Sequence, residues 1–254
     1  MNDGATLADG LLAGRRVVLT GAAGGIGRIL AEVLRAAGAD SILLDRPGDL
    51  LDDLGASLSD DHTLVEAVDV TDRAAVAATR DRVVSERGPI DGLVNCAGLW
   101  RPAPFAEVDA TAWDDTVAAN LESAFVCCQA LLPGMLERRS GSIVNFASTA
   151  GEYGSISPAA HYAAAKGGII ALTKSLAREA GPGNVRVNAV SPGPTDTPAL
   201  GAASPEQKAA VGARTLLGRL GQPREIAYGA LFLLSPLSTF VTGHVLRVNG
   251  GSLL

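Results

Sequence analysis

The 254-residue chain contains only three cysteines, and neither their number nor their spacing suits a disulfide framework or a metal site. Cys127 and Cys128 are adjacent, Cys96 stands alone, and none belongs to a CxxC pair or lies at metal-ligand spacing from a histidine. An odd set of this kind is typical of small buried thiols in a reducing compartment. We therefore expect no metal centre.

Long apolar runs are missing as well. No stretch reaches the ~18 residues that a membrane span requires. The first residues, MNDGATLADGLLAG, are acidic and lack the charged-then-apolar order of a signal peptide. We expect a cytoplasmic protein that does not bind membranes, with residues 1–13 as a flexible extension.

The chain has fewer basic than acidic residues. Lys and Arg number 21 against 27 Asp and Glu, which gives a formal net charge of −6, and no basic stripe offsets this average. Nucleic acids and anionic membrane surfaces are bound largely through positive charge, so the balance argues against both as partners. A small molecule is the partner that we expect.

The chain does have short apolar runs that alternate with longer helical patterns, without a linker or an internal repeat. Near-continuous apolar strands separated by helices predict a doubly wound α/β fold, in which seven parallel strands carry helices on both faces. Residues 1–254 then form one domain, and 46–61 is the only stretch without an obvious element. The predicted strands are 16–20, 41–45, 63–68, 92–95, 142–147, 185–190 and 245–248. The predicted helices are 26–37, 72–86, 113–136, 161–179 and 223–234.

The first predicted strand runs into the glycine-rich sequence TGAAGGIG. Gly21, Gly25 and Gly27 let the backbone turn tightly and approach a pyrophosphate closely. The helix that follows at Ile26 offers amide donors and the positive end of its dipole. The sequence therefore predicts a phosphate cradle for a dinucleotide, although its GxxxGxG spacing differs from the GxGxxG fingerprint. Taken alone, the motif could also be only a tight connection.

Asp45 ends the second predicted strand, eighteen residues after Gly27. A carboxylate at this place can accept hydrogen bonds from both hydroxyls of an adenosine ribose and repels a 2′-phosphate, which favours NAD over NADP. Arg46 follows directly and is the nearby cation that could meet a 2′-phosphate instead. The sequence DRPG would also suit Asp45 as a turn former at the strand end.

Tyr162 and Lys166 lie four residues apart in the helical run HYAAAK, and Ser148 lies fourteen residues upstream at the end of an apolar strand. The four-residue spacing places the phenol and the ammonium on one helix face. A phenol has a reference pKa of about 10, and a fixed positive charge beside it favours the phenolate. The pair could then do acid–base work near neutral pH, or it could be a chance pair on a solvated helix face.

Three further motifs accompany these: NCAG at 95–98, AANLESAF at 118–125 and SPGPTDT at 191–197. With all of them in order, the chain resembles the short-chain dehydrogenases/reductases over nearly its whole length. The resemblance implies a Rossmann-type fold and an oxidoreductase. It also implies four catalytic residues: Asn120, Ser148, Tyr162 and Lys166.

The resemblance implies a role for each of the four. Tyr162 removes the hydroxyl proton of an alcohol, or returns it to a ketone, while hydride passes to or from a nicotinamide. Ser148 binds the substrate oxygen. Lys166 lowers the pKa of Tyr162 and holds the nicotinamide ribose. Asn120 holds a water that relays protons from Lys166, although a helix kink is an alternative role for this residue.

Cofactor contacts also follow from the resemblance. Asp69 and Val70 are expected to hold the adenine, and the NCAG turn, through Asn95, Ala97 and Gly98, to line the ribose. The remaining residues expected to contact the cofactor are Tyr162, Lys166, Pro192, Gly193, Thr195 and Thr197.

The chain departs from the family pattern at three places. Fourteen positions separate Ser148 from Tyr162 where many relatives have thirteen, a spacing that Thr149 would restore. We assign Ser148 because IVNFAS resembles the family's strand end IVNISS. Cys96 replaces an asparagine and Thr195 a branched apolar residue, and we expect both exchanges to leave the chemistry intact.

The substrate pocket is where the sequence is least specific. By resemblance, residues 196–217 form a lid over it, and this segment is rich in small residues. Trp100, Glu152, Tyr153 and His161 are the residues that we expect in its walls.

The function that we expect is an NAD-dependent interconversion of a secondary alcohol and a ketone. The chain's length and its sequence GRLGQPREIA resemble 3-oxoacyl-[acyl-carrier-protein] reductases, which mostly use NADPH, so that activity is the main alternative. A catalytically silent dinucleotide-binding regulator is disfavoured by the intact catalytic residues. A nucleotide-sugar epimerase or dehydratase is also less expected, because those relatives usually carry a longer C-terminal substrate domain.

Two helices also suggest self-association. Residues 113–136 and 161–179 carry more Ala, Leu and Gly than one face of a sheet requires, so we expect them to pair with a second copy. The family resemblance implies a homotetramer, with the end of the seventh strand in the second interface. A homodimer is the simpler alternative.

Overall fold

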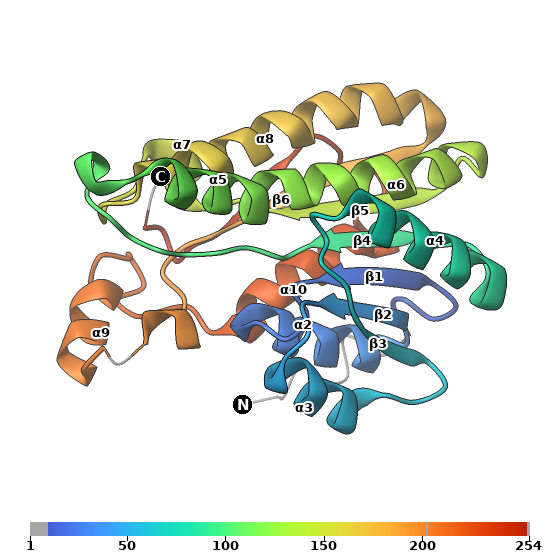
Figure 1. The fold of residues 1–254 in the computed structure, drawn as a ribbon, viewed down its shortest axis with the longest axis horizontal. Helices are drawn as coiled ribbons and strands as arrows, with labels where there is room; N and C mark the ends of the chain where they lie inside the picture. Colours follow the sequence, from blue (N-terminus) through green and yellow to red (C-terminus); the bar gives the residue numbers. More distant parts are fainter. Residues whose placement is uncertain (1–9, 202, 253–254) are drawn as a thin grey trace.

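A computed structural model describes residues 10–201 and 203–252 (Figure 1). Its centre is a parallel sheet of seven strands in the order β3-β2-β1-β4-β5-β6-β7, which confirms the predicted doubly wound fold. The strands are β1 (Arg16–Thr20), β2 (Asp40–Asp45), β3 (Thr63–Ala67), β4 (Gly92–Asn95), β5 (Gly141–Phe146), β6 (Val185–Pro192) and β7 (Val245–Val248).

Helices cover both faces of the sheet (Figure 1). One face carries α2 (Gly25–Ala36), α3 (Asp49–Leu58) and α10 (Pro223–Leu234). The other carries α4 (Arg73–Arg87), α6 (Ser123–Glu137) and α8 (Ala160–Ala180). Because the three central residues of β1 are apolar, they enter both cores in alternation: Val17 and Leu19 pack with the first set and Val18 with the second.

The strand order reverses between β1 and β4, which lie side by side with Val17 opposite Gly92 and Thr20 opposite Asn95. In such sheets the carboxyl ends of the strands open a crevice at the point of reversal. The segments that follow those ends gather at the left of Figure 1, where α5 (Ala110–Val117), α7 (Thr149–Tyr153) and α9 (Pro205–Gly212) also lie.

The structure corrects three details of the sequence prediction. Residues 46–61 are not without an element, because α3 forms there and buries Leu51 and Leu54. The predicted helix 113–136 is divided by a π-helical turn, Ala118–Glu122. Of the expected extension 1–13, residues 1–9 lie outside the described residues. Residues 10–13 are no extension, since Leu12 is buried in the core.

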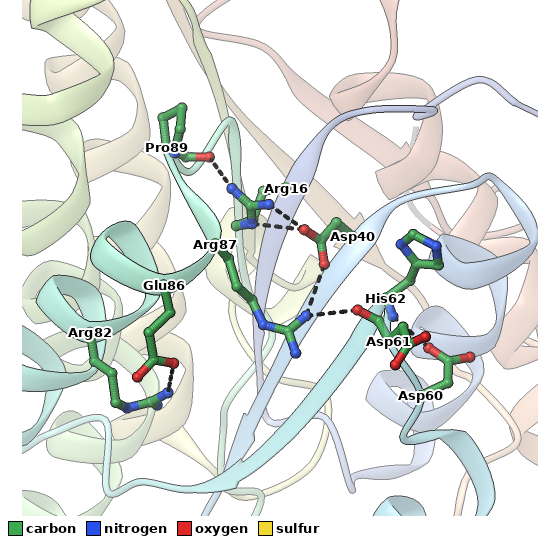
Figure 2. Close-up of polar contacts among 9 residues, drawn as sticks. All are labelled: Arg16, Asp40, Asp60, Asp61, His62, Arg82, Glu86, Arg87 and Pro89. Carbon is green, nitrogen blue, oxygen red and sulfur yellow. Dashed lines mark hydrogen bonds and ion pairs between the residues drawn. The ribbon is translucent and has the colours of Figure 1, made fainter.

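The amino ends of the strands are tied by a charged network (Figure 2). Arg16 and Asp40 begin β1 and β2 as directly paired residues, and Arg16 Nε donates to Asp40 Oδ2 at 2.9 Å. Arg87, at the end of α4, donates to Asp40 Oδ1 at 3.3 Å and to the Asp61 carbonyl at 3.1 Å. Since Asp40 is only 19% exposed, one carboxylate joins two strands and a helix at the edge opposite the crevice.

We predict that Asp40→Asn lowers the free energy of unfolding by about 2–3 kcal/mol, because it leaves two partly buried guanidinium groups without a counter-charge. Urea denaturation measures this. Asp81→Asn is the matched control, since Asp81 pairs with Arg80 at 2.7 Å but is 70% exposed and should cost less than ~0.5 kcal/mol. Equal effects of the two substitutions would contradict the role given to Asp40.

Candidate functional site

The glycine-rich turn between β1 and α2 is shaped by close backbone contacts. Gly21 has a φ of +68°, and a Cβ there would lie 2.6 Å from the Ala97 backbone. A Cβ on Gly27 would lie 1.9 Å from the Gly21 carbonyl oxygen. The Gly24 N-cap makes no side-chain hydrogen bond to the first amides of α2. The turn therefore fits a phosphate group, because it presents backbone donors and the positive end of a helix dipole without a capping side chain.

Asp45 reaches across the carboxyl end of β2 toward this turn. Its Oδ2 accepts a hydrogen bond from the Ala23 amide at 2.9 Å, and its Oδ1 accepts one from the Arg46 amide at 2.8 Å. These two bonds fix the carboxylate next to the glycine-rich turn. The residues predicted for the phosphates and for the adenosine ribose are thus brought together.

Asp69 and Val70 follow β3 at the same edge. Asp69 accepts hydrogen bonds from the Thr71 amide at 2.9 Å and the Thr71 hydroxyl at 2.7 Å. These bonds lower the pKa of Asp69, and the charge of Arg46 lowers it further. Val70 is buried. The charge of Arg46 thus acts on the Asp69 carboxylate, at the carboxyl end of the neighbouring strand.

The NCAG turn connects the residues predicted to bind the cofactor with the residues predicted to be catalytic. The Ala97 amide donates to Thr20 Oγ1 at 3.2 Å, and Asn95 Nδ2 donates to Asn145 Oδ1 at 2.8 Å. A Cβ on Gly98 would lie 2.8 Å from Asn120 Oδ1 and 3.5 Å from Lys166 Nζ. Two of the four predicted catalytic residues therefore meet against the bare backbone of this turn.

Asn120 lies in the π-helical turn and is 1% exposed. Its Nδ2 donates to the Leu99 and Thr116 carbonyls, both at 2.9 Å, and its Oδ1 accepts from the Leu99 amide at 3.2 Å. Both amide hydrogens are therefore used within the protein. The expected water would be held by the remaining acceptor capacity of Asn120, and the widened turn agrees with the alternative of a helix irregularity.

Ser148 and Tyr162 are joined by a hydrogen bond, which lowers the pKa of Tyr162. Burial of the phenol acts more strongly and raises that pKa above its usual value. In the protein without a cofactor the pKa of Tyr162 is therefore raised, whereas the sequence predicts that Lys166 lowers it. The Nζ of Lys166 lies 5.8 Å from the centre of the Tyr162 ring. Ser148 also accepts from the Ala150 amide at 3.1 Å and so begins α7.

Lys166 is a buried cation, 4% exposed, on the inner face of α8. Its Nζ donates to the Phe146 carbonyl at the end of β5 at 2.8 Å. Burial lowers the pKa of Lys166 from 10.5 to about 8. The sequence carried no signal for this partner, because it is a backbone atom twenty residues away.

The four predicted wall residues have different surroundings. Trp100 contacts Tyr162 edge-on, with 4.8 Å between the ring centres, so it borders the phenol. Tyr153, the last residue of α7, is 49% exposed. His161, in contrast, is buried and holds the Arg101 carbonyl at 3.0 Å through Nε2, and Glu152 is engaged by other side chains. The polar groups of His161 and Glu152 are therefore engaged within the protein.

The segment after β6 lies against the glycine-rich turn. β6 continues through Pro192, Thr195 Oγ1 donates to the Gly193 carbonyl at 2.9 Å, and a Cβ on Gly25 would lie 3.0 Å from Thr197 Cβ. The predicted lid, 196–217, contains α9 and includes residue 202, which lies outside the described residues. The capping box at the start of α9, formed by Ser204 and Gln207, could have been recognised in the sequence SPEQ.

Burial raises the pKa of Cys96 to about 12 and also raises the pKa values of Cys127 and Cys128, so all three thiols are protonated at neutral pH. Across residues 10–201 and 203–252, no three His, Cys, Asp or Glu side chains are grouped closely enough to hold a metal ion.

In the same part of the chain, no helix has both the length and the apolar character to cross a membrane.

Comparisons with known proteins agree on one family. A family model described as enoyl-(acyl carrier protein) reductase matches residues 21–252. The 3-oxoacyl-[acyl-carrier-protein] reductase FabG of Vibrio cholerae is 39% identical over 244 residues, which are 94% of this chain and 98% of that protein. The cis-4-hydroxycyclohexanecarboxylate dehydrogenase of Sinomonas cyclohexanicum is 38% identical over 240 residues, which are 93% of this chain and 96% of that protein.

Solved structures give the same picture. A protein from Brucella melitensis, described as short-chain dehydrogenase/reductase SDR:Glucose/ribitol dehydrogenase, superposes with a TM-score of 0.89 at 38% identity. The match covers 96% of this chain and 98% of that chain. Reductases and dehydrogenases are thus similar to this chain to nearly the same degree.

The buried ammonium of Lys166 predicts a pH dependence of stability. Below pH 8 the folded and unfolded chains both carry the proton, and the full cost of burying the charge is present. Between about pH 8 and 10.5 only the unfolded chain keeps it, so stability rises with pH. Relative to Lys166→Met, the free energy of unfolding of the wild type should rise by about 3 kcal/mol across this window, measured by urea denaturation.

Lys174→Met serves as the control, because it removes an exposed lysine from the same helix. Burial of Lys166 is rejected as the cause if the two substitutions change the pH dependence of stability by the same amount.

Proposed function

Because the chain belongs to the short-chain dehydrogenase/reductase family of oxidoreductases, we propose that it interconverts a secondary alcohol and a ketone by hydride transfer, with NAD as its cofactor. The observation that carries the proposal is the meeting of Ser148, Tyr162 and Lys166 beside the NCAG turn. That turn also contacts the glycine-rich turn through Gly21 and Ala97. The proposed acid–base groups and the proposed dinucleotide-binding turn therefore lie on either side of the NCAG turn.

The chain's own residues divide the work. A nicotinamide dinucleotide, when bound, supplies the hydride acceptor or donor. Tyr162 takes the proton from the substrate hydroxyl during oxidation and returns it during reduction. Ser148 donates a hydrogen bond to the substrate oxygen and stabilises the charge that develops there.

The protonation state of Tyr162 differs between the two directions. Burial favours the neutral phenol, the form that donates a proton in ketone reduction. Alcohol oxidation requires the phenolate, which the hydrogen bond with Ser148 and the nearby Lys166 ammonium both favour. Oxidation should therefore gain more from raised pH than reduction does.

The cofactor contacts follow the surfaces described above. Gly21, Gly25, Ile26 and Gly27 hold the phosphates, with Asp45 at the adenosine ribose. The adenine and the nicotinamide half are held by Asp69, Val70, Asn95, Ala97, Gly98, Pro192, Gly193, Thr195 and Thr197, with Lys166 at the nicotinamide ribose.

The carboxylate of Asp45 supports NAD rather than NADP. It is fixed by two backbone amides, so it cannot easily turn away from a 2′-phosphate. Like charges brought together cost several kcal/mol, which far exceeds the 1.4 kcal/mol of a tenfold preference.

A 3-oxoacyl-[acyl-carrier-protein] reductase that uses NADPH is the second candidate. The 36% to 39% identity to proteins of that name favours it. The dehydrogenase relative is equally similar at 38%, so overall identity does not decide between the two activities. Asp45 is the feature that favours NAD and a dehydrogenase.

We retain a homotetramer in the cytoplasm as part of the proposal. Two large apolar side chains, Trp113 on α5 and Phe125 on α6, are 44% and 40% exposed on the helices predicted to pair. Phe240, before β7, is fully exposed near the predicted second interface. These exposed apolar side chains lie on the surfaces that the proposal assigns to contacts between copies of the chain.

The first test concerns the cofactor. Purified protein is screened with secondary alcohols and either NAD or NADP, and the absorbance of the reduced nicotinamide gives kcat/KM. We expect NAD to be preferred, and Asp45→Ala to shift the NAD-to-NADP ratio by roughly 10²-fold toward NADP. Arg46→Ala is the control, which should change the ratio little. Equal rates with both cofactors, or an NADP preference of the wild type, would refute the Asp45 argument.

The second test concerns the proton. Tyr162→Phe should lower kcat by at least roughly 10²-fold, since it removes the acid–base group, while NAD binding measured by fluorescence titration stays nearly unchanged. Tyr228→Phe, on α10, is the matched control and should keep wild-type activity. Full activity of Tyr162→Phe would end this mechanism.

A further inference from the structure

The one-turn helix α7 lies between Ser148 and Tyr162 and is too short to hold itself in place. Its position must therefore come from tertiary contacts. One of them is with α8: a Cβ on Gly151 would lie 2.5 Å from the Lys166 carbonyl carbon, so the two backbones touch. The Gly151 amide also donates to the Ser148 carbonyl at 2.9 Å.

Glu152 provides the contact on the other side. Its Oε1 accepts a hydrogen bond from Ser191 Oγ at 2.6 Å, and its Oε2 accepts one from Arg247 Nε at 2.7 Å. The Glu152 side chain is 10% exposed, and Ser191 is fully buried. Both carboxylate oxygens of Glu152, a residue expected in the wall of the substrate pocket, are thus hydrogen-bonded within the protein.

The two donors come from neighbouring strands in exact register. Ser191 of β6 and Arg247 of β7 are paired directly, so their side chains point to the same face of the sheet. The Glu152 carboxylate of α7 therefore accepts hydrogen bonds from two neighbouring strands. The Arg247 guanidinium also lies over the Tyr153 ring, 5.3 Å from its centre, and so touches the next residue of the same helix.

We propose that Glu152 is a positioning residue for Ser148, acting through a clamp that it forms with Ser191 and Arg247. The clamp fixes α7 against β6 and β7, while Gly151 fixes it against α8. Ser148 begins this helix and accepts from its Ala150 amide, so a movement of α7 displaces the hydroxyl that meets Tyr162. The catalytic consequence rests on the proposed function, whereas the clamp itself does not.

Kinetics on wild type and variants test the consequence. Glu152→Ala and Arg247→Met should each lower kcat roughly 10- to 100-fold while KM for NAD stays within about twofold, because only the reacting hydroxyl is misplaced. The double variant should be no slower than the slower single variant, since both substitutions break one unit. Arg247→Lys, which keeps a cationic donor, should restore most of the rate.

Glu179→Ala is the matched control, because Glu179 is an exposed carboxylate on α8, and its kcat should equal that of the wild type. Rate losses that multiply in the double variant, or an unchanged kcat in Glu152→Ala, overturn the positioning role.

Amide hydrogen exchange tests the clamp without any substrate. The Ala150 and Gly151 amides, which donate to Ser148, should exchange at least roughly tenfold faster in Glu152→Ala and in Arg247→Met, while the core amide of Ile169 in α8 is unchanged. Unaltered exchange at these two amides refutes the clamp, whatever the activity. A wild type with no alcohol-dependent NAD reduction would refute the proposed function, and the exchange result would still decide on the clamp.

Discussion

The hydrogen bond from the buried Lys166 ammonium to the Phe146 carbonyl is the interaction around which the site is built. A charge out of contact with water is tolerated only where strong acceptors and close packing compensate for lost hydration. Here the acceptor is the end of a central strand, so α8 must lie directly on β5. The same ammonium lies beside the bare backbone of Gly98 and near the Tyr162 ring, which places α8 against the turn predicted to line the cofactor ribose.

Close backbone approach is the means by which this arrangement is reached. Gly21 meets the NCAG turn, Gly98 meets Asn120, and Gly151 meets the backbone at Lys166, each at a distance that leaves no room for a Cβ. These contacts join the glycine-rich turn, the π-helical turn and α7 into one continuous wall. The charged network of Arg16, Asp40 and Arg87 holds the opposite end of the sheet (Figure 2). The charged network thus lies at the amino ends of the strands, and the predicted site lies at their carboxyl ends.

Much of this could be predicted from the sequence because local patterns carry it. Continuous apolar strands and the spaced motifs gave the sheet and the residues that meet at its edge. The helix α3 was missed because its acidic residues mask the buried pair Leu51 and Leu54. Glu152 could not be placed, since its partners Ser191 and Arg247 are 39 and 95 residues away in the chain. The raised pKa of Tyr162 was missed for a related reason, because burial is a property of the packed fold.

Direct titration of Lys166 tests the central claim, that a buried ammonium organises the site. The chain has three lysines, so a sample with isotope-labelled lysine side chains gives few NMR signals, and the Lys166 signal is identified by its loss in Lys166→Met. A pKa of about 8 is expected for the protein without cofactor. A value at the ordinary 10.5 would show that the ammonium is solvated and would contradict the account.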